Sequence, residues 1–179
     1  MIIDSHAHYN NNAYKKPFRY LSYDKEGYIL KEGELSQLIQ EMVDAKIPYS
    51  IEPGVSLQSC EEVLQLSAEY PERIFPAIGI HPTRSIFEKW SDRHKLAAYA
   101  NTPGVIAIGE IGLDYHYKRE EQHRLKQHLW FIYQLNLALL ISTAGTCRMA
   151  ANWCVSRCLR FLGKVKIKRC AFISRLFPY

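Results

Sequence analysis

Apolar positions in the first 137 residues fall into two alternating patterns, short continuous runs and runs with helical spacing. Continuous apolar runs bounded by proline or glycine predict buried strands. Segments in which apolar residues recur every three or four positions predict amphipathic helices. The predicted strands are 2–8, 49–52, 74–80 and 105–109, and the predicted helices are 34–45, 57–69, 85–100 and 120–136.

The predicted helices carry their apolar residues on one side, which indicates the faces that pack against the strands. Ser56 is a suitable N-cap for helix 57–69, because a serine side chain accepts a hydrogen bond from a free backbone amide. The polar and aromatic segment 9–33 has neither periodicity, so we expect an irregular loop over the mouth of a site. The residues expected to face inward from the last two helices are Ile86, Trp90, Ala97, Leu125, Leu129, Ile132 and Tyr133.

Strand and helix alternate four times at intervals of about thirty residues, which is typical of parallel βα units. Four units make half of a (β/α)₈ barrel, since a whole one needs about 250 residues. A small open doubly wound sheet is the alternative, but no glycine-rich phosphate loop follows the first strand. The sequence therefore predicts an α/β fold that forms the first half of a TIM barrel.

The composition agrees with a globular domain, with 179 residues of which 47% are apolar. No apolar run reaches the roughly 18 residues that a membrane-spanning helix needs. The N-terminus lacks the basic and apolar regions of a secretory signal. We therefore expect a cytoplasmic protein without a membrane partner.

Charge and cysteine divide the chain into two unlike parts. Residues 1–121 hold 13 basic and 18 acidic residues, whereas residues 122–179 hold 10 basic residues and no acid. Four of the five cysteines also lie in the second part. Because folded surfaces normally mix both signs of charge, we predict a partial barrel domain over 1–137 and an unrelated, weakly structured, basic and cysteine-rich tail over 138–179.

His6 and His8 are the first candidates for chemistry, because they close the first predicted strand. Residues two apart in a strand point to the same face, so both imidazoles project from its carboxyl end. Active sites lie at that end in parallel α/β folds, and neutral imidazole binds divalent transition metals. The alternative is an ordinary pair of surface histidines. Residues elsewhere in the chain are needed to distinguish a metal site from such a pair.

Two later strands also end in polar groups. The third strand runs into His81, and the fourth runs into Glu110 and then Asp114. A carboxylate in an apolar strand is costly to bury unless it is paired or binds a metal. Together with the first histidines, these groups match a hydrolytic metal centre. The alternatives are a structural histidine at 81 and a buried ion pair at Glu110.

Three segments together resemble the TatD family of metal-dependent deoxyribonucleases and related hydrolases. They are DSHAH at 4–8, GIHP at 79–82 and IGEIGLDY at 108–115, in the order and spacing of the family. The resemblance covers about residues 1–137 and implies a TIM barrel of the amidohydrolase kind. It also implies one or two divalent cations (Mg, Mn or Zn) in the barrel mouth. Asn10 stands where many members carry an aspartate.

The resemblance assigns roles to five residues. His6 and His8 would ligate one metal, and Glu110 would bridge two metals and serve in catalysis. His81 and Asp114 would contact the substrate or orient the ligands. The implied reaction is hydrolysis of a phosphodiester in DNA by metal-activated water, without a protein partner. The same ligands would also serve lactone, amide or phosphotriester cleavage, and an inactive truncated remnant is a further alternative.

The resemblance breaks after about residue 137. The family continues with a strand that ends His-Ser-Arg-Asp and with a later histidine and aspartate, whereas this chain has no histidine after His128 and no acid after Glu121. Reading the codons of residues 142–146 one base out of phase can restore His-Ser-Arg-Asp. We therefore predict a frameshift near residue 137 in the gene or in its sequencing.

Two other interpretations of the tail are weaker. Zinc modules favour two close cysteine pairs, but only Cys154 and Cys158 are close in sequence. A basic nucleic-acid-binding arm would contain fewer aromatic and leucine residues. We therefore expect that the tail carries no function of its own.

Overall fold

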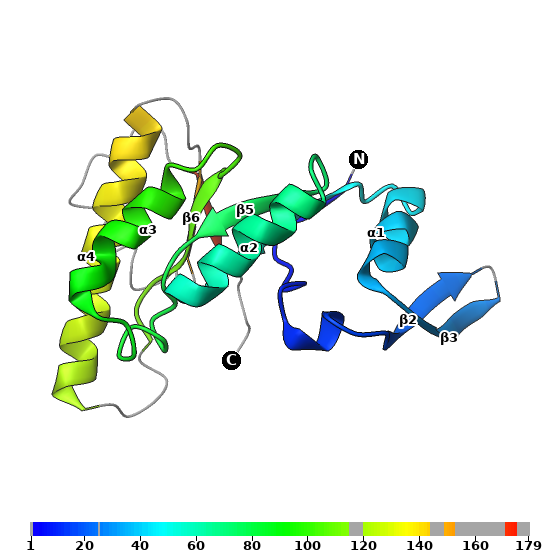
Figure 1. Cartoon of the computed structure of the whole chain (residues 1–179), viewed down its shortest axis with the longest axis horizontal. Helices are drawn as coiled ribbons and strands as arrows, with labels where there is room; N and C mark the ends of the chain where they lie inside the picture. The colour runs from blue at the N-terminus through cyan, green and yellow to red at the C-terminus, as the bar shows by residue number, and fades with distance from the viewer. Residues whose placement is uncertain (1, 25, 115–119, 144–148, 153–170, 175–179) are drawn as a thin grey trace.

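The computed structural model describes residues 2–24, 26–114, 120–143, 149–152 and 171–174. Within them, six parallel strands form a sheet in the order β1-β4-β5-β6-β7-β8, and helices connect the successive strands up to β7 (Figure 1). The strands are β1 (Ile3–Asp4), β4 (Tyr49–Pro53), β5 (Ile74–Ile78), β6 (Ala107–Ile111), β7 (Met149–Asn152) and β8 (Ala171–Ser174), and the helices are α1 (Leu35–Asp44), α2 (Leu57–Glu69), α3 (Arg93–Ala100) and α4 (Glu121–Thr143).

The order of the strands in the sheet follows their order in the chain. A doubly wound sheet reverses its strand order at a switch point, and the described strands show no such reversal. Consecutive strands that pair in parallel are the arrangement of a (β/α)₈ barrel. The predicted α/β fold with the first half of a barrel is therefore confirmed.

Apolar residues pack on both faces of this sheet. Ile78 and Ile108 lie side by side in β5 and β6 and pack against α3 and α4 in the largest core cluster. Their neighbours along the strands, Ala77 and Ala107, face the other way and form a smaller cluster with Ile51. The helices thus cover one face, which corresponds to the outside of a barrel, and leave the strand ends available for a site.

The predicted helices over 34–45 and 57–69 are confirmed. α2 has the predicted bounds, and the hydroxyl of its N-cap Ser56 accepts a hydrogen bond from the amide of Ser59 at 3.1 Å. α1 begins one residue later than predicted, because Glu34 is its N-cap and its amide donates to the side chain of Gln37. Local sequence signals were enough to predict these two helices, because the capping residues and the spacing of apolar residues indicate the same bounds.

The prediction of a helix over 85–100 was wrong for the first half of that range. The amides of Arg84 and Ser85 donate to the carbonyl of His81 in a turn, a 3₁₀ turn follows at Trp90–Asp92, and α3 begins only at Arg93. The Ser85 hydroxyl donates to the Pro82 carbonyl at 2.7 Å. Such side-chain bonds to a nearby backbone compete with helix formation.

The inward face predicted for the last helix was also wrong. Leu125, Leu129 and Ile132 are 59%, 49% and 46% exposed, and only Tyr133 of the predicted set packs against the core. The buried face of α4 instead consists of Gln127, Trp130, Phe131, Gln134, Leu137 and Ala138. Apolar spacing alone picked the wrong face, because two buried glutamines lie on the correct one.

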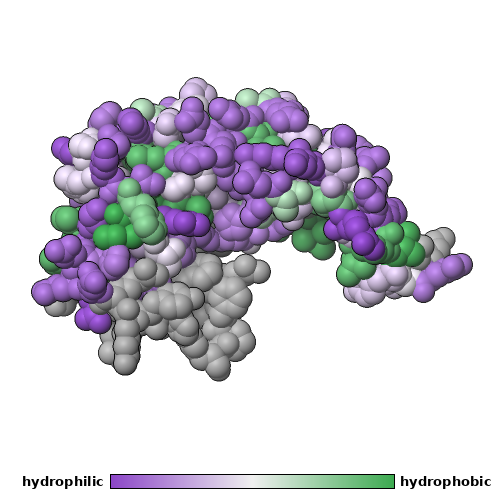
Figure 2. All heavy atoms as spheres, turned by 60° about the horizontal axis from the view of Figure 1, so that its bottom comes forward, coloured by the Kyte–Doolittle hydropathy of each residue, from purple (hydrophilic) through white to green (hydrophobic). Residues whose placement is uncertain are grey.

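Segment 9–33 contains a β-hairpin rather than an irregular loop. β2 (Phe18–Asp24) pairs antiparallel with β3 (Gly27–Gly33) along their whole length. Leu21, Leu30, Tyr23 and Tyr28 face away from α1 and are 55–77% exposed. Figure 2 shows apolar side chains gathered at this end of the molecule. The hairpin was missed because apolar residues also lie on its outward face, so apolar and polar residues do not alternate along its strands.

The first strand is short and lies at the edge of the sheet. Ile2 and Ile3, predicted to be buried, are 61% and 49% exposed. Among the described strands, β1 pairs only with β4, so its other side has no neighbour to cover it. Burial on both faces and both edges requires a closed barrel.

The predicted boundary at residue 137 remains a prediction. α4 continues through that position to Thr143, and β7 and β8 belong to the tail yet pair in parallel with the sheet. The cysteines of the tail lie outside the described residues. No helix in the described part of the chain has the length and apolar character that crossing a membrane requires.

Candidate metal centre

His6 and His8 lie just beyond the end of β1, and their imidazole rings point toward each other. The Asp4 carboxylate accepts a hydrogen bond from the His6 amide at 3.1 Å, and the Ala7 amide donates to the Ile51 carbonyl of β4 at 2.9 Å. The two imidazole Nε2 atoms are 3.1 Å apart. A side-chain contact with Asp4 of β1 and a backbone contact with β4 therefore orient the histidine pair.

Glu110 lies in β6, and its side chain reaches the two histidines at the end of β1. Its residue is only 4% exposed, and its Oε1 lies 2.6 Å from His6 Nε2. The Glu110 amide donates to the Gly54 carbonyl beyond β4 at 3.0 Å. A Cβ at Gly79 would collide with the backbone of Gly109 and Glu110, so the close approach of β5 and β6 requires glycine there.

Three ligand atoms from His6, His8 and Glu110 all lie within 4.8 Å of one another. Ligands at bonding distance around a tetrahedral zinc ion are about 3.4 Å apart, which matches this cluster in scale. Imidazole nitrogen and carboxylate oxygen are ligands that zinc and related divalent metals accept. The donor set thus fits a divalent cation.

The charges in this group also favour metal binding. Burial by itself raises the pKa of Glu110, but the contact with His6 and the charges of His81, His6 and His8 outweigh it and keep the pKa below its usual value. Burial lowers the pKa of His81, although Glu110 and Asp114 oppose that effect. An ionised glutamate and a neutral histidine are the forms in which these groups bind metal or donate to substrate.

His81 lies beside the same carboxylate. Its Nε2 is 3.9 Å from Glu110 Oε2, and its Nδ1 lies 2.7 Å from the Thr83 hydroxyl. Asp114 is 8% exposed and close enough for its charge to raise the pKa of His81. The structure thus brings His81 next to the cluster, and Asp114 lies near enough to His81 for their charges to interact.

Two glutamines of α4, which the sequence reasoning missed, fasten the segments that carry these groups. Gln134 accepts from the Ile80 amide at 2.6 Å and donates to the Ile80 carbonyl at 3.2 Å, directly before His81. Gln127 accepts from the Asp114 amide at 3.0 Å. Their seven-residue spacing places both on one helix face, and that spacing was the available signal.

Glu52 was missed as well. It lies in β4, is fully buried, and accepts a hydrogen bond from the Asn10 amide at 2.9 Å. Its signal was the same as for Glu110, a carboxylate inside an apolar strand between Ile51 and Pro53.

Comparison with known proteins decides the family. A family model described as TatD related DNase matches residues 3–144. The chain belongs to the TatD family. This confirms the resemblance seen in the three motifs.

Named relatives of this TatD family chain are hydrolases. The uncharacterized metal-dependent hydrolase YabD of Bacillus subtilis is 23% identical over 145 residues, which cover 79% of this chain and 50% of YabD. The 3'-5' ssDNA/RNA exonuclease TatD of Edwardsiella piscicida is 28% identical over 111 residues, which cover 61% of this chain and 41% of that protein. The chain thus spans half or less of the length of these relatives.

A solved structure supports the fold of this TatD family chain. The crystal structure of YJJV, a TatD homologue from Escherichia coli, matches with a TM-score of 0.63 at 20% identity. The match covers 84% of this chain and 49% of the other. At this level of identity the likeness concerns the fold alone.

Proposed function

We propose that this chain is a metal-dependent hydrolase that cleaves phosphodiester bonds of nucleic acid, with its cation held by His6, His8 and Glu110. The observation that carries the proposal is the convergence of these three donors at the carboxyl ends of β1 and β6. Membership in a family whose named members include a nuclease supports the substrate class.

The residues of the chain have distinct parts in this proposal. His6 and His8 offer ring nitrogens, and Glu110 offers a carboxylate that its surroundings keep ionised. When bound, a divalent cation activates water and stabilises negative charge on a phosphate. His81, which contacts Thr83 and lies beside Glu110, is proposed to contact the substrate, and Asp114 is proposed to contact the substrate or to orient the ligands.

The proposed substrate is a single strand of DNA or RNA with a free 3' end. The relative from Edwardsiella piscicida is named for that activity. Residues 1–121 have a net charge of −5, so their overall charge does not attract phosphate. We therefore propose that a bound cation, rather than a basic surface, provides the main attraction for the phosphodiester.

The proposal is tested with the purified 179-residue chain and a 5'-labelled single-stranded oligonucleotide. We expect shortening of the strand in the presence of Mn²⁺, Mg²⁺ or Zn²⁺ and none after chelation. His6→Ala and Glu110→Gln should reduce turnover to background, because each removes a proposed ligand. His128→Ala is the matched control, since that histidine is exposed on α4 and should leave the rate unchanged.

Two results would contradict the proposal. Turnover equal to that of a His6→Ala, Glu110→Ala double variant would identify an inactive remnant. Metal-dependent cleavage of lactones or amides without cleavage of oligonucleotides would assign another hydrolase chemistry to the same ligands.

A further inference from the structure

The segment that carries the two histidines is fastened to β4 at two consecutive residues. The Ile51 carbonyl accepts from the Ala7 amide, between the histidines, and the Glu52 carboxylate accepts from the Asn10 amide, two residues beyond His8. Both distances are 2.9 Å. The first contact continues the pairing of β1 with β4, whereas the second uses a side chain.

The Glu52 side chain is an unusual choice for such a contact. It is fully buried, and its second oxygen, Oε2, makes no hydrogen bond within the described part of the chain. No ion pair joins it to a lysine or arginine among those residues. Burying a carboxylate without a cationic partner is unfavourable, so a neutral residue would serve stability better.

The surroundings of Glu52 connect it with the metal-binding segment. Burial raises its pKa to about 7, and the backbone amides of Asn10 and Tyr9 oppose that rise; the charge of Asp4 raises the pKa further, whereas a charge on His6 lowers it. A cation near His6 would act in the same direction as that charge. The carboxylate is thus linked by contact to Asn10 and by its field to His6.

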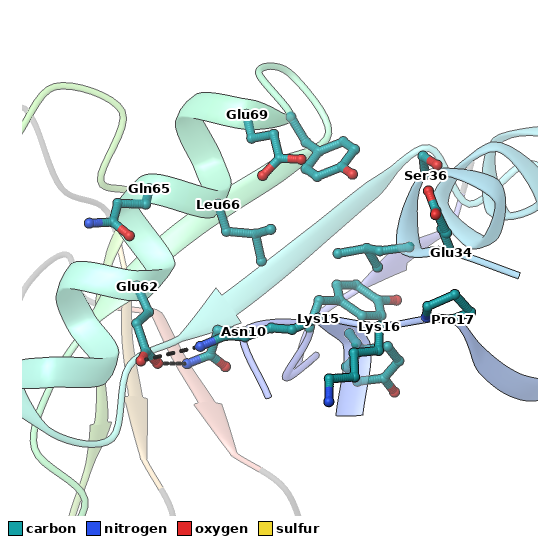
Figure 3. Close-up of a pocket in the computed structure, with 14 residues that line it drawn as sticks. Asn10, Lys15, Lys16, Pro17, Glu34, Ser36, Glu62, Gln65, Leu66 and Glu69 are labelled. Carbon is teal, nitrogen blue, oxygen red and sulfur yellow. Dashed lines mark hydrogen bonds and ion pairs between the residues drawn. The ribbon is translucent and has the colours of Figure 1, made fainter. Parts of the chain in front are cut away.

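The opposite side of Asn10 faces a pocket and a different glutamate. Figure 3 shows Asn10 and Lys15 directed toward Glu62 of α2, with Asn10 Nδ2 3.5 Å and Lys15 Nζ 3.7 Å from its carboxylate oxygens. These residues line a pocket of about 450 Å³ between the segment after His8, α1 and α2. Glu62 therefore contacts the side chain of Asn10, whereas Glu52 contacts its backbone amide.

We propose that Glu52 is a positioning residue, which holds His6 and His8 in their metal-binding orientation by fixing the backbone after His8 through the Asn10 amide. The inference rests on the proposed metal site but not on the identity of the substrate. Glu52 itself is not a ligand in this proposal, since it lies outside the group of three ligand atoms.

The test compares Glu52→Ala and Glu52→Gln with Glu62→Gln as the matched control. Glutamine keeps an acceptor oxygen for the Asn10 amide, whereas alanine removes it. The readouts are hydrogen exchange of residues 6–11 in the metal-free chain and the affinity and visible absorption spectrum of Co²⁺ alone. Circular dichroism identifies any variant that fails to fold.

We expect faster exchange of residues 6–11 and about tenfold to hundredfold weaker Co²⁺ binding in Glu52→Ala, with an altered absorption spectrum, as for other groups that orient metal ligands. Glu52→Gln should restore both readouts to within about threefold, and Glu62→Gln should resemble the wild type. If Glu52→Ala does not fold, Glu52→Gln decides, because a native exchange pattern and native Co²⁺ spectrum are then required of it.

Unchanged exchange and Co²⁺ affinity in a folded Glu52→Ala would overturn the inference. Weak Co²⁺ binding by a folded Glu52→Gln would also overturn it, because charge rather than the hydrogen bond would then be responsible. Failure of the proposed function looks different. In that case the oligonucleotide stays intact, while the exchange and Co²⁺ readouts still respond to Glu52 as described.

Discussion

Glu110 and Glu52 are both carboxylates inside apolar strands, and the same physical argument applies to each. A buried carboxylate requires a compensating partner, and at Glu110 the partners are His6 and His81. The sequence drew attention to Glu110 because a recognisable motif surrounds it. Glu52 has no such motif, although its strand is just as buried. Buried carboxylates thus deserve the same weight wherever they occur in a strand.

Gln134 allows a prediction at the scale of one residue. We expect Gln134→Met to lower the free energy of unfolding by about 2–4 kcal/mol, because it leaves the buried amide and carbonyl of Ile80 without their partner. Methionine has a similar volume, so packing should change little. Urea denaturation followed by fluorescence measures the effect.

Gln122→Met is the matched control, since Gln122 is exposed on the same helix. Equal stability of the two variants would show that the Ile80 backbone finds other partners.

At the scale of elements, the β2–β3 hairpin is the largest departure from expectation. One carboxylate of α1 contacts the inner face of this hairpin at several points. Glu41 accepts hydrogen bonds from the Tyr20 hydroxyl at 3.0 Å, the Ser22 hydroxyl at 2.7 Å and Lys31 Nζ at 2.7 Å. These partners lie on both hairpin strands, so a single helical residue contacts both of them. Residue spacing along the chain cannot show contacts of this kind.

The hairpin contact predicts a dependence on pH. The hydrogen bond from Lys31 is the largest cause that keeps the pKa of Glu41 below its ordinary value of 4.5, and Ser22 adds to it. A lowered pKa in the folded state stabilises the protein above pH 4.5, and this stability is lost as the pH falls through the folded-state pKa. We therefore expect the wild type to exceed Glu41→Gln in stability at pH 6, with the difference shrinking toward pH 3.

Urea denaturation of both proteins at several pH values measures this difference. Glu32→Gln, an exposed residue on the other face of β3, serves as the control and should show little change. A constant difference between wild type and Glu41→Gln across this range would show that the charge of Glu41 does not fasten the hairpin.

At the scale of the whole molecule, the described sheet is open. β1 has one partner, and Ile2 and Ile3 are exposed beside it. The relatives extend over about twice the matched length. The change of composition after residue 121 is an observation from the sequence, whereas the frameshift near residue 137 stays a prediction.

The reading frame yields a prediction about the gene. Resequencing the source DNA across the codons of residues 137–146 should reveal one missing or additional base. The corrected frame should read His-Ser-Arg-Asp from the codons of 142–146 and then a later histidine and aspartate. An unchanged base order would contradict a sequencing error and place the change in the gene itself. An in-frame relative with the same 138–179 sequence would contradict a frameshift altogether.

The sequence by itself determined most of the alternation of strands and helices and the family, and it predicted five candidate site residues. These features depend on local spacing, capping and motifs, which neighbouring residues in the chain encode directly. Only the tertiary structure decided which face of α4 is buried, that segment 9–33 contains a hairpin, and that the side chains of Glu52, Gln127 and Gln134 accept hydrogen bonds from distant backbone amides. The contacts of Glu52 and Gln134 join residues 42 and 54 positions apart, and the pattern of apolar residues along the chain does not show which distant residues meet.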